Sequence, residues 1–373
     1  MIILKKIYFY ILIIIFYKII LKLNYKKNNK NIRPFFGFIK NKYGGPSVRT
    51  SRMIKMYGNY FFNFNLIYAQ SHWSEFELKL LIENKKKIKV PIVFNQNGWF
   101  YNGWYKGNAK SRNNLLVDVQ KISDFVIFQS KFCLNTGLTF NNFTPKDYSI
   151  IHNCIPDFLP KNFKKKNNNK INFLLSGYFF NILTKNINNN DVTHIIFPAI
   201  KSFFYILKNI KINKQIKLNI VGIEKNFFKK INNQEIKIMS KELIERKVLS
   251  IKNSYNLDEY IDILSYTDVA LHLKYKDPCP NSVIERMMAG IPHIYSNSGG
   301  TPELVAETGI PINVKETWND QLSVSSDDLS EKIIQIIKNF KILSKKSILR
   351  SKLYNWQNYI NKHNEIFNRA LNK

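Results

Sequence analysis

The sequence is poor in cysteine, and its few cysteines are far apart. Only three occur among 373 residues: Cys133, Cys154 and Cys279. They form no C-x-x-C pair, and an odd number argues against a disulfide framework. We therefore expect free thiols in a reducing compartment. Hydrophobic residues make up 45% of the chain and aromatic residues 14%, which excludes a disordered protein, and the length predicts two domains or one large one.

Acidic residues are also scarce, and their distribution is uneven. The chain has 26 Asp and Glu against 57 Lys and Arg, a net charge of +31. An AT-rich genome would produce many Lys, Asn and Ile, which accounts for part of this excess. It does not account for the first 74 residues, where thirteen basic residues precede the first acid, Glu75. Such a field attracts nucleic acid or an anionic lipid surface, and the apolar segment beside it favours a membrane partner over nucleic acid.

That apolar segment begins near the N-terminus. Residues 7–17 are all apolar or aromatic, Lys18 interrupts the run, and residues 19–23 partly resume it. A helix over residues 7–23 would span roughly 25 Å, a little less than a hydrocarbon core of ~30 Å. No small-residue cleavage site follows, so we expect residues 1–23 to be a membrane anchor rather than a cleaved signal peptide. Basic residues are denser after the segment, which places the main body on the cytoplasmic face of the membrane. The alternative is a buried first strand or helix of the folded body.

After this segment, short apolar runs alternate with helical patterns. Strands are expected at 65–70, 91–95, 124–129, 148–152, 171–176, 217–221, 268–273, 291–296 and 310–314. Each expected strand reads as apolar on both faces, as parallel strands between helices do. Helices are expected at 194–209, 256–266 and 327–340. Pro156, Pro160 and a basic polar run mark residues 156–170 as an interdomain linker. The fold class is therefore α/β, with two doubly wound parallel sheets over residues 30–155 and 171–350, and ligands are expected at the carboxyl ends of their strands.

Residues 275–307 carry the most informative pattern. Pro278 and Pro280 force an extended loop after strand 268–273, and Asn281 or Ser282 is expected to cap the helix that follows. Free N–H groups at the start of that helix, including that of Val283, can hold a diphosphate. Glu285, about one turn in, can accept hydrogen bonds from a ribose diol. Asp277 lies in the loop, within reach of sugar hydroxyls.

A glycine turn follows the helix that carries Glu285. Gly299 and Gly300 precede Thr301, an expected cap, and Pro302, expected at the first helical position. Each of these pieces alone is ordinary helix capping. Together they are far less common by chance.

This segment resembles the retaining glycosyltransferase family 4, the glycosyl transferases group 1, of the GT-B fold. The family pattern of an acid, seven residues and Glu appears as Asp277 and Glu285, followed by Ala289-Gly290-Ile291-Pro292 and the run Gly299 to Val305. The stretches DPCPNSVIE and SGGTPELV are most similar to a bacterial subgroup that builds surface polysaccharides. The resemblance covers roughly residues 35–370 in element order and is specific in 275–307.

The resemblance implies roles for other positions. The N-terminal domain would bind the acceptor and the C-terminal domain a nucleotide-diphosphate sugar, with residues 351–373 forming a helix that returns to the N-terminal domain. Gly44 and Gly45 resemble the family's N-terminal glycine loop, which faces the donor. Asn97 stands where the family often has a His near the reacting sugar; an Asn can bind a hydroxyl but cannot act as a general base. His72 is a candidate acceptor-side residue, although a structural role is the commoner one for such a histidine.

One departure from the family pattern concerns the diphosphate. Family members commonly have Gly-Arg after the first strand of the second domain and a Lys later, whereas this chain has Gly177-Tyr178. Lys185 is the remaining candidate clamp, and other cations that could substitute are Arg49, Arg52 and Arg286. Arg286 follows Glu285 and is expected on a different face of the helix.

The implied reaction moves a sugar from a nucleotide sugar to an acceptor hydroxyl with retained configuration. The acceptor is expected to be lipid-linked or a polysaccharide. There is no D-x-D motif, so neither a metal nor another cofactor is expected. Two other functions stay open: a GT-B epimerase of the sugar nucleotide, and a degenerate non-catalytic scaffold that binds it.

Overall fold

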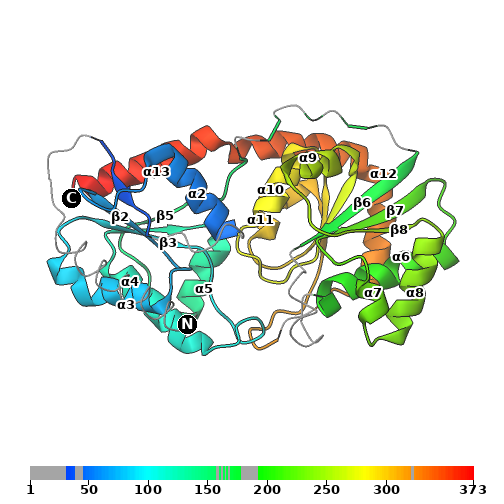
Figure 1. Ribbon diagram of the computed structural model, residues 1–373, viewed down its shortest axis with the longest axis horizontal. Helices are drawn as coiled ribbons and strands as arrows, with labels where there is room; N and C mark the ends of the chain where they lie inside the picture. The colour runs from blue at the N-terminus through cyan, green and yellow to red at the C-terminus, as the bar shows by residue number, and fades with distance from the viewer. Residues whose placement is uncertain are drawn as a thin grey trace, which may run out of the picture. The chain divides into compact units, whose positions relative to one another are not determined.

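The chain forms two compact α/β units (Figure 1). The computed structural model describes residues 31–37, 45–156, 159–160, 163, 165–166, 169–177, 192–320 and 323–373. Unit 1 comprises the chain up to Asn153 together with Gln357–Lys373, and unit 2 comprises Cys154–Trp356. Each unit is built on one parallel β-sheet, which confirms the prediction of two parallel-sheet α/β domains.

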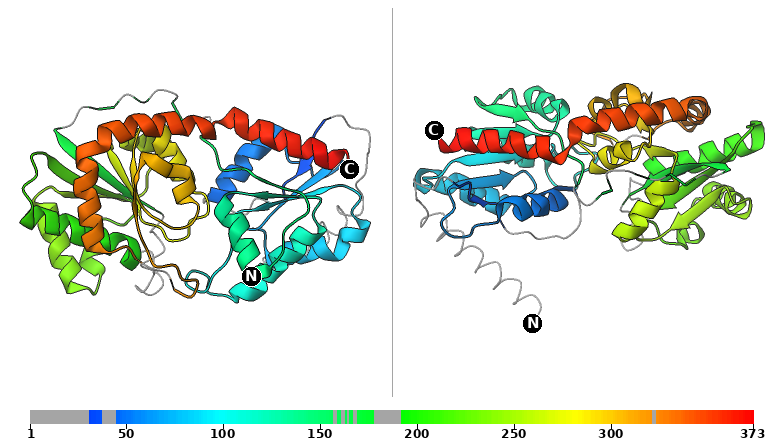
Figure 2. Two further views of the ribbon diagram at one scale, coloured as in Figure 1. Left: turned by 180° about the vertical axis from the view of Figure 1, so that it is seen from behind. Right: turned by 90° about the horizontal axis from the view of Figure 1, so that it is seen from above.

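Unit 1 has a five-stranded sheet whose described strands follow the chain order, β1-β2-β3-β4-β5. The strands are β1 Pro34–Phe35, β2 Leu66–Gln70, β3 Ile92–Gln96, β4 Phe125–Phe128 and β5 Tyr148–Ile150. The helices are α2 Gly45–Tyr57, α3 Glu75–Asn84, α4 Ala109–Ile122, α5 Lys131–Asn141 and the C-terminal α13 Trp356–Leu371. Helix α13 packs beside α2 and the sheet (Figure 2): Tyr57 donates to Asn364 Oδ1 at 2.7 Å, and the Tyr57 and Phe367 rings meet edge to face.

Unit 2 has a six-stranded sheet of order β11-β10-β9-β6-β7-β8. The strands are β6 Lys170–Ser176, β7 Gln215–Val221, β8 Leu249–Lys252, β9 Val269–His272, β10 His293–Ser296 and β11 Ile310–Ile312. The helices are α6 Phe197–Asn209, preceded by a π-helical turn at Val192–Ile196, α7 Phe227–Lys230, α8 Gln234–Glu245, α9 Leu257–Tyr266, α10 Asn281–Met288, α11 Thr301–Val305 and α12 Ser326–Ser351. The strand order reverses between β6 and β9, as in a doubly wound sheet.

One face of the unit 2 sheet carries the larger core. Alternate residues of β6 and β7, such as Phe173 and Leu218, pack against α6, α8 and α12 (Figures 1 and 2). On the opposite face α9 covers Leu174 and Val221 through Ile263. Polar side chains share that second face along β6, β7 and β8. The expectation of strands apolar on both faces is therefore wrong for this side of the sheet.

The expected strands all form, with ends shifted by a few residues, and two more are present. These are β1 and β8, of two and four residues, which are too short for a periodic signal. The expected helix 327–340 extends to Ser351. Of the expected linker, the described Lys165 and Lys166 belong to unit 2, where the Lys165 ammonium donates to the carbonyl of Leu264 at 3.1 Å. The expected anchor at 7–23 lies outside the described residues. Within the part of the chain that the structure describes, no helix is long and apolar enough to cross a bilayer.

Candidate active site

The reversal of strand order in unit 2 marks the edge where ligands of such sheets bind. Strand β6 ends there at Ser176 and β9 at His272, both at the carboxyl edge of the sheet. The segment after β9 contains Asp277, α10 and α11. The fold therefore places the sequence-predicted donor residues of unit 2 at this edge.

Helix α10 begins with N–H groups that have no intrahelical acceptor. Its N-cap is Pro280, in an extended conformation and without a side-chain cap, so the expected cap at Asn281 or Ser282 is wrong. Proline fixes the extended entry, and both polar residues fall in the first turn instead. Their N–H groups have no acceptor among the described residues, and both residues are half-buried. A diphosphate can accept from these groups at the positive end of the helix dipole.

Val283 has a packing role in this structure. Its side chain is fully buried in a cluster with Met287 and Leu304, and its N–H donates to the Pro280 carbonyl at 3.2 Å. The helix is therefore anchored by its apolar face while its first two N–H groups stay available.

Glu285 is held by a tyrosine from another helix. The Tyr260 hydroxyl on α9 donates to Glu285 Oε2 at 3.0 Å, and the Tyr255 ring stacks on Tyr260 with centroids 5.3 Å apart. Burial first, and then the charge of Glu285, raises the pKa of Tyr260 well above 10, so its hydroxyl keeps its proton. No short-range motif links Tyr260 to Glu285, so the sequence does not predict this partner.

The side chain of Arg286 points from α10 to the end of β6. Its side chain is buried, and one guanidinium nitrogen donates to Ser176 Oγ. Burial, followed by the positive charge of Arg286, lowers the pKa of His272 well below 6.5, and the same two causes act on His293. As expected, Arg286 and Glu285 diverge from the helix: one bonds to the sheet and the other to α9.

The loop that carries Asp277 is fixed by close backbone contact with the Gly299-Gly300 turn. Gly300 N donates to the Asp277 carbonyl at 2.8 Å. Gly299 has φ +71°, and a Cβ there would lie 2.4 Å from the Asp277 carbonyl oxygen, so only glycine fits. The N-cap of α11 is Gly300, not the expected Thr301, and Thr301 begins the helix as a buried residue.

A buried lysine holds the same loop from the other side. Lys276 has φ 52° and is 4% exposed; its ammonium pairs with Glu316 and lies 3.6 Å from the centre of the Trp318 ring. Ser298 Oγ donates to the other Glu316 oxygen at 3.1 Å. Asp277 Oδ2 is 3.7 Å from His272 Nε2, too long for a hydrogen bond, and the lowered pKa keeps His272 neutral. The Asp277 carboxylate, 21% exposed, therefore faces the edge on a rigid loop.

Unit 1 brings together a second group of predicted residues. Asn97, which follows β3, places its Nδ2 2.9 Å from His72 Nδ1, and its N–H donates to Ser71 Oγ at 2.9 Å. Arg49 on α2 donates to Asn97 Oδ1 at 2.6 Å and to Gln70 Oε1 at 3.0 Å. Arg49 is 4% exposed, whereas His72 is exposed. Arg49 thus binds the amide that stands in the position of the family's histidine.

The remaining predicted residues are placed as follows. Gly45 is the exposed first residue of α2, and Gly44 lies outside the described residues, as does Lys185. Arg52 is a buried residue of α2. The role of Lys185 as a diphosphate clamp stays a prediction.

A family match covers the residues of the unit 2 edge. Residues 196–352 match the family described as glycosyl transferases group 1. This part of the chain is a glycosyl transferases group 1 domain. It contains α10, Glu285 and the Gly299-Gly300 turn, and the predicted likeness to group 1 is confirmed over these residues. No curated protein sequence matches the chain.

Solved glycosyltransferases share the two-unit fold. HepE of Anabaena, crystallised with UDP, is 13% identical with a TM-score of 0.59, over 87% of this chain and 82% of that one. A glycosyltransferase of Rickettsia africae is 13% identical with a TM-score of 0.58, over 90% and 84%. Sucrose-phosphate synthase of Thermosynechococcus elongatus is 14% identical with a TM-score of 0.56, over 87% and 78%. At these identities the likeness shows the GT-B fold alone.

Proposed function

We propose that the protein is a retaining glycosyltransferase of family 4 that moves a sugar from a nucleotide-diphosphate sugar to an acceptor hydroxyl. One observation carries this proposal. In the group 1 domain, the open N-terminus of α10 and the tyrosine-held Glu285 lie one helical turn apart at the carboxyl edge of the sheet. The first suits a diphosphate and the second a ribose diol.

The other residues of this edge have matching roles in the proposal. Asn281 and Ser282 bind the diphosphate through their N–H groups, and Asp277 binds hydroxyls of the transferred sugar. Gly299 and Gly300 hold the Asp277 loop at a fixed distance. HepE was crystallised with UDP and with UDP-glucose, which makes uridine donors the first to test.

The proposed chemistry needs no protein nucleophile. The bond between the anomeric carbon and the diphosphate oxygen breaks, and the acceptor oxygen bonds to that carbon on the same face. The departing phosphate oxygen takes the acceptor proton. The protein supplies position and charge stabilisation, from α10 and from Lys185, without a metal.

The acceptor side is proposed for unit 1. Asn97 and the exposed His72 offer hydrogen bonds to a saccharide hydroxyl. We propose a lipid-linked or polysaccharide acceptor at the cytoplasmic face of a membrane. The apolar residues 7–17 and the thirteen basic residues before Glu75 support this location.

The test is donor turnover by the purified chain. UDP-glucose, UDP-galactose and UDP-N-acetylglucosamine are incubated with it, and slow release of UDP is followed with and without EDTA. Glu285→Gln should lose most of the turnover, while Glu331→Gln, an exposed acid of α12, should keep it. An epimerase would change the sugar without releasing UDP, and a scaffold would bind UDP without turnover; either result refutes transfer.

A further inference from the structure

One face of the unit 2 sheet is polar where parallel sheets are usually covered. On β7, Lys217 and Asn219 share this face, and on β8, Ser250 and Lys252 do, because side chains alternate along a strand. Helix α9 covers the neighbouring Leu174 and Val221, whereas Lys217, Ser250 and Lys252 stay half-buried. Parallel strands normally bury both faces, so polar side chains here indicate a polar occupant.

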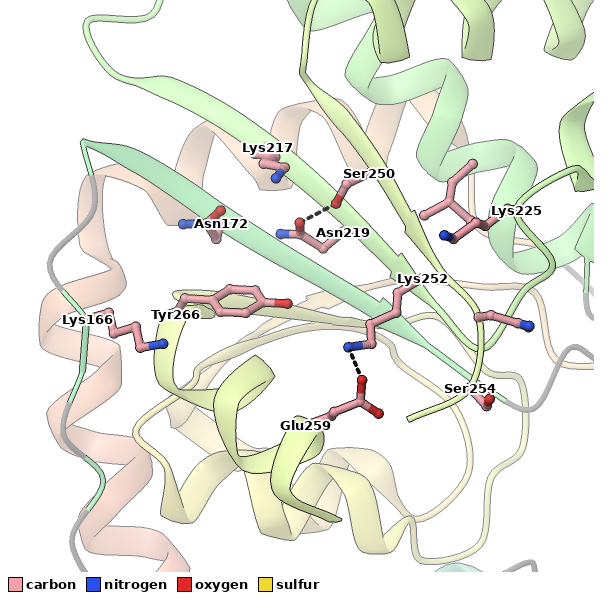
Figure 3. A pocket seen from close by; sticks show the side chains of 12 residues that line it. Lys166, Asn172, Lys217, Asn219, Lys225, Ser250, Lys252, Ser254, Glu259 and Tyr266 are labelled. Atoms are coloured by element: carbon pink, nitrogen blue, oxygen red, sulfur yellow. Dashed lines mark hydrogen bonds and ion pairs between the residues drawn. The ribbon is translucent and has the colours of Figure 1, made fainter. Parts of the chain in front are cut away.

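This face is hollow (Figure 3). The hollow has a volume of about 750 Å³ and lies between the sheet, α9 and the loops at residues 225 and 253–254. Lysine ammonium groups come into it from several elements, with amides and hydroxyls between them and the Tyr266 ring on one wall. Its full lining is Lys166, Asn172, Lys217, Asn219, Lys225, Ser250, Ile251, Lys252, Asn253, Ser254, Glu259 and Tyr266.

A second hollow continues the first along the sheet. It has a volume of about 560 Å³, shares Asn172, Lys217 and Ser250 with the first, and adds Lys170 and Lys247. The two together make a trough from the carboxyl edge of β8 to the start of β6. Such a length suits an extended ligand rather than a single small ion.

Most of the positive charge in the trough has no internal partner. Lys252 pairs with Glu259 at 2.7 Å, and Lys166 pairs with Asp262 at 2.5 Å. The other four lysines make no ion pair with the described residues. These four are Lys170, Lys217, Lys225 and Lys247. Glu259, already paired, is the carboxylate among the lining residues.

We propose that this trough binds an acidic glycan, a saccharide chain that carries carboxylate or phosphate groups. Lysine ammonium groups pair with the anionic groups. The side-chain amides of Asn172 and Asn253 and the hydroxyl of Ser254 hydrogen-bond sugar hydroxyls, and Asn219 positions Ser250 by accepting from its hydroxyl at 2.5 Å. The face of Tyr266 gives a pyranose ring an apolar surface. The trough is distinct from the Glu285 edge, and the proposal does not depend on sugar transfer.

Other anions fit the trough less well. A bilayer surface attracts lysines that project outward, whereas these line a concavity. Single-stranded nucleic acid binds on a series of aromatic platforms, and Tyr266 is the one aromatic lining residue. The experiment below therefore also measures binding to lipid vesicles and to a single-stranded oligonucleotide.

The experiment measures binding by calorimetry without a nucleotide sugar, at about 50 mM salt where charge pairing is weakly screened. The probes are a hyaluronan hexasaccharide, with a carboxylate on alternate sugars, and neutral maltohexaose. The variant is the double substitution Lys217→Gln and Lys225→Gln. The matched control removes the same charge from exposed positions of α12, Lys338→Gln and Lys345→Gln.

The wild type should bind the acidic hexasaccharide and not the neutral one. The trough variant should bind the acidic hexasaccharide at least about tenfold more weakly, and the control variant should bind it like the wild type. Equal loss in both variants would reduce the effect to net charge and overturn the proposal. So would equal binding of maltohexaose, or a lysine-dependent preference for inorganic phosphate, oligo-dT or phosphatidylserine vesicles. Unchanged melting temperatures show that the variants are folded.

Discussion

The hydrogen bond from Tyr260 to Glu285 gives the sharpest test of the proposed donor site. Tyr260→Phe removes one hydroxyl and keeps the ring that stacks on Tyr255. A hydrogen bond to a charged group contributes about 1.5–3 kcal/mol when buried. Solvent screens the half-buried Glu285, which lowers the contribution to about 1 kcal/mol. Without the hydroxyl the carboxylate loses a contact that orients it toward the proposed ribose. We expect donor affinity to fall about fivefold.

The assay is calorimetric titration with UDP and with uridine. Both ligands carry the ribose, so Tyr260→Phe should weaken both by the same factor, and Glu285→Gln should weaken both more. Tyr266→Phe removes a hydroxyl from the other end of the same helix, in the trough lining, and should leave both affinities unchanged. Wild-type affinity in Tyr260→Phe, combined with a loss in Glu285→Gln, would refute the orienting role.

Three further predictions concern the loop, acid stability and the membrane. Gly299→Ala places a Cβ against the Asp277 backbone at φ +71°; turnover should fall at least about tenfold with circular dichroism unchanged, and normal turnover would contradict a fixed Asp277. Burial lowers the pKa of His363 to about 3, so the stability from its neutral form is present above about pH 6.5 and lost towards pH 3. Near pH 5 the free energy of unfolding in urea should fall, for each unit by which the pH is lowered, by about 1.4 kcal/mol more in the wild type than in His363→Gln. Equal pH slopes in the two proteins would contradict this role of His363. A chain lacking residues 1–23 should bind anionic but not neutral vesicles at low salt and release them at high salt; no binding at low salt would make the N-terminal charge irrelevant to docking.

Local spacing explains why the donor segment could be found from the sequence. Residues 275–307 contain in one stretch a strand end, a helix start, Glu285 one turn later and a glycine turn. Each depends on near neighbours, so the sequence predicts them together. The positions of the caps were wrong because Pro280 and Gly300 each take the cap one residue earlier than the polar side chain that was expected there.

The partners of these residues could not be found in the same way. Tyr260 and Glu285 are 25 residues apart in different helices, and Arg49 and Asn97 are 48 apart. Their proximity depends on the crossovers of the sheet, which no periodicity encodes. Strand β8 was missed because its four residues are too few to show a periodic pattern.

The contact of Arg49 with Asn97 also determines where hydrogen atoms point. A guanidinium only donates, so the oxygen of the Asn97 amide must face Arg49, and its NH₂ must face His72. The Nδ1 atom of His72 then has to be the acceptor, and its hydrogen resides on Nε2. The buried Arg49 therefore sets the tautomer of the exposed His72 through two successive hydrogen bonds, with Asn97 between them. In this tautomer Nε2 can donate a hydrogen bond but cannot take up a proton, so His72 cannot serve as a general base toward the proposed acceptor.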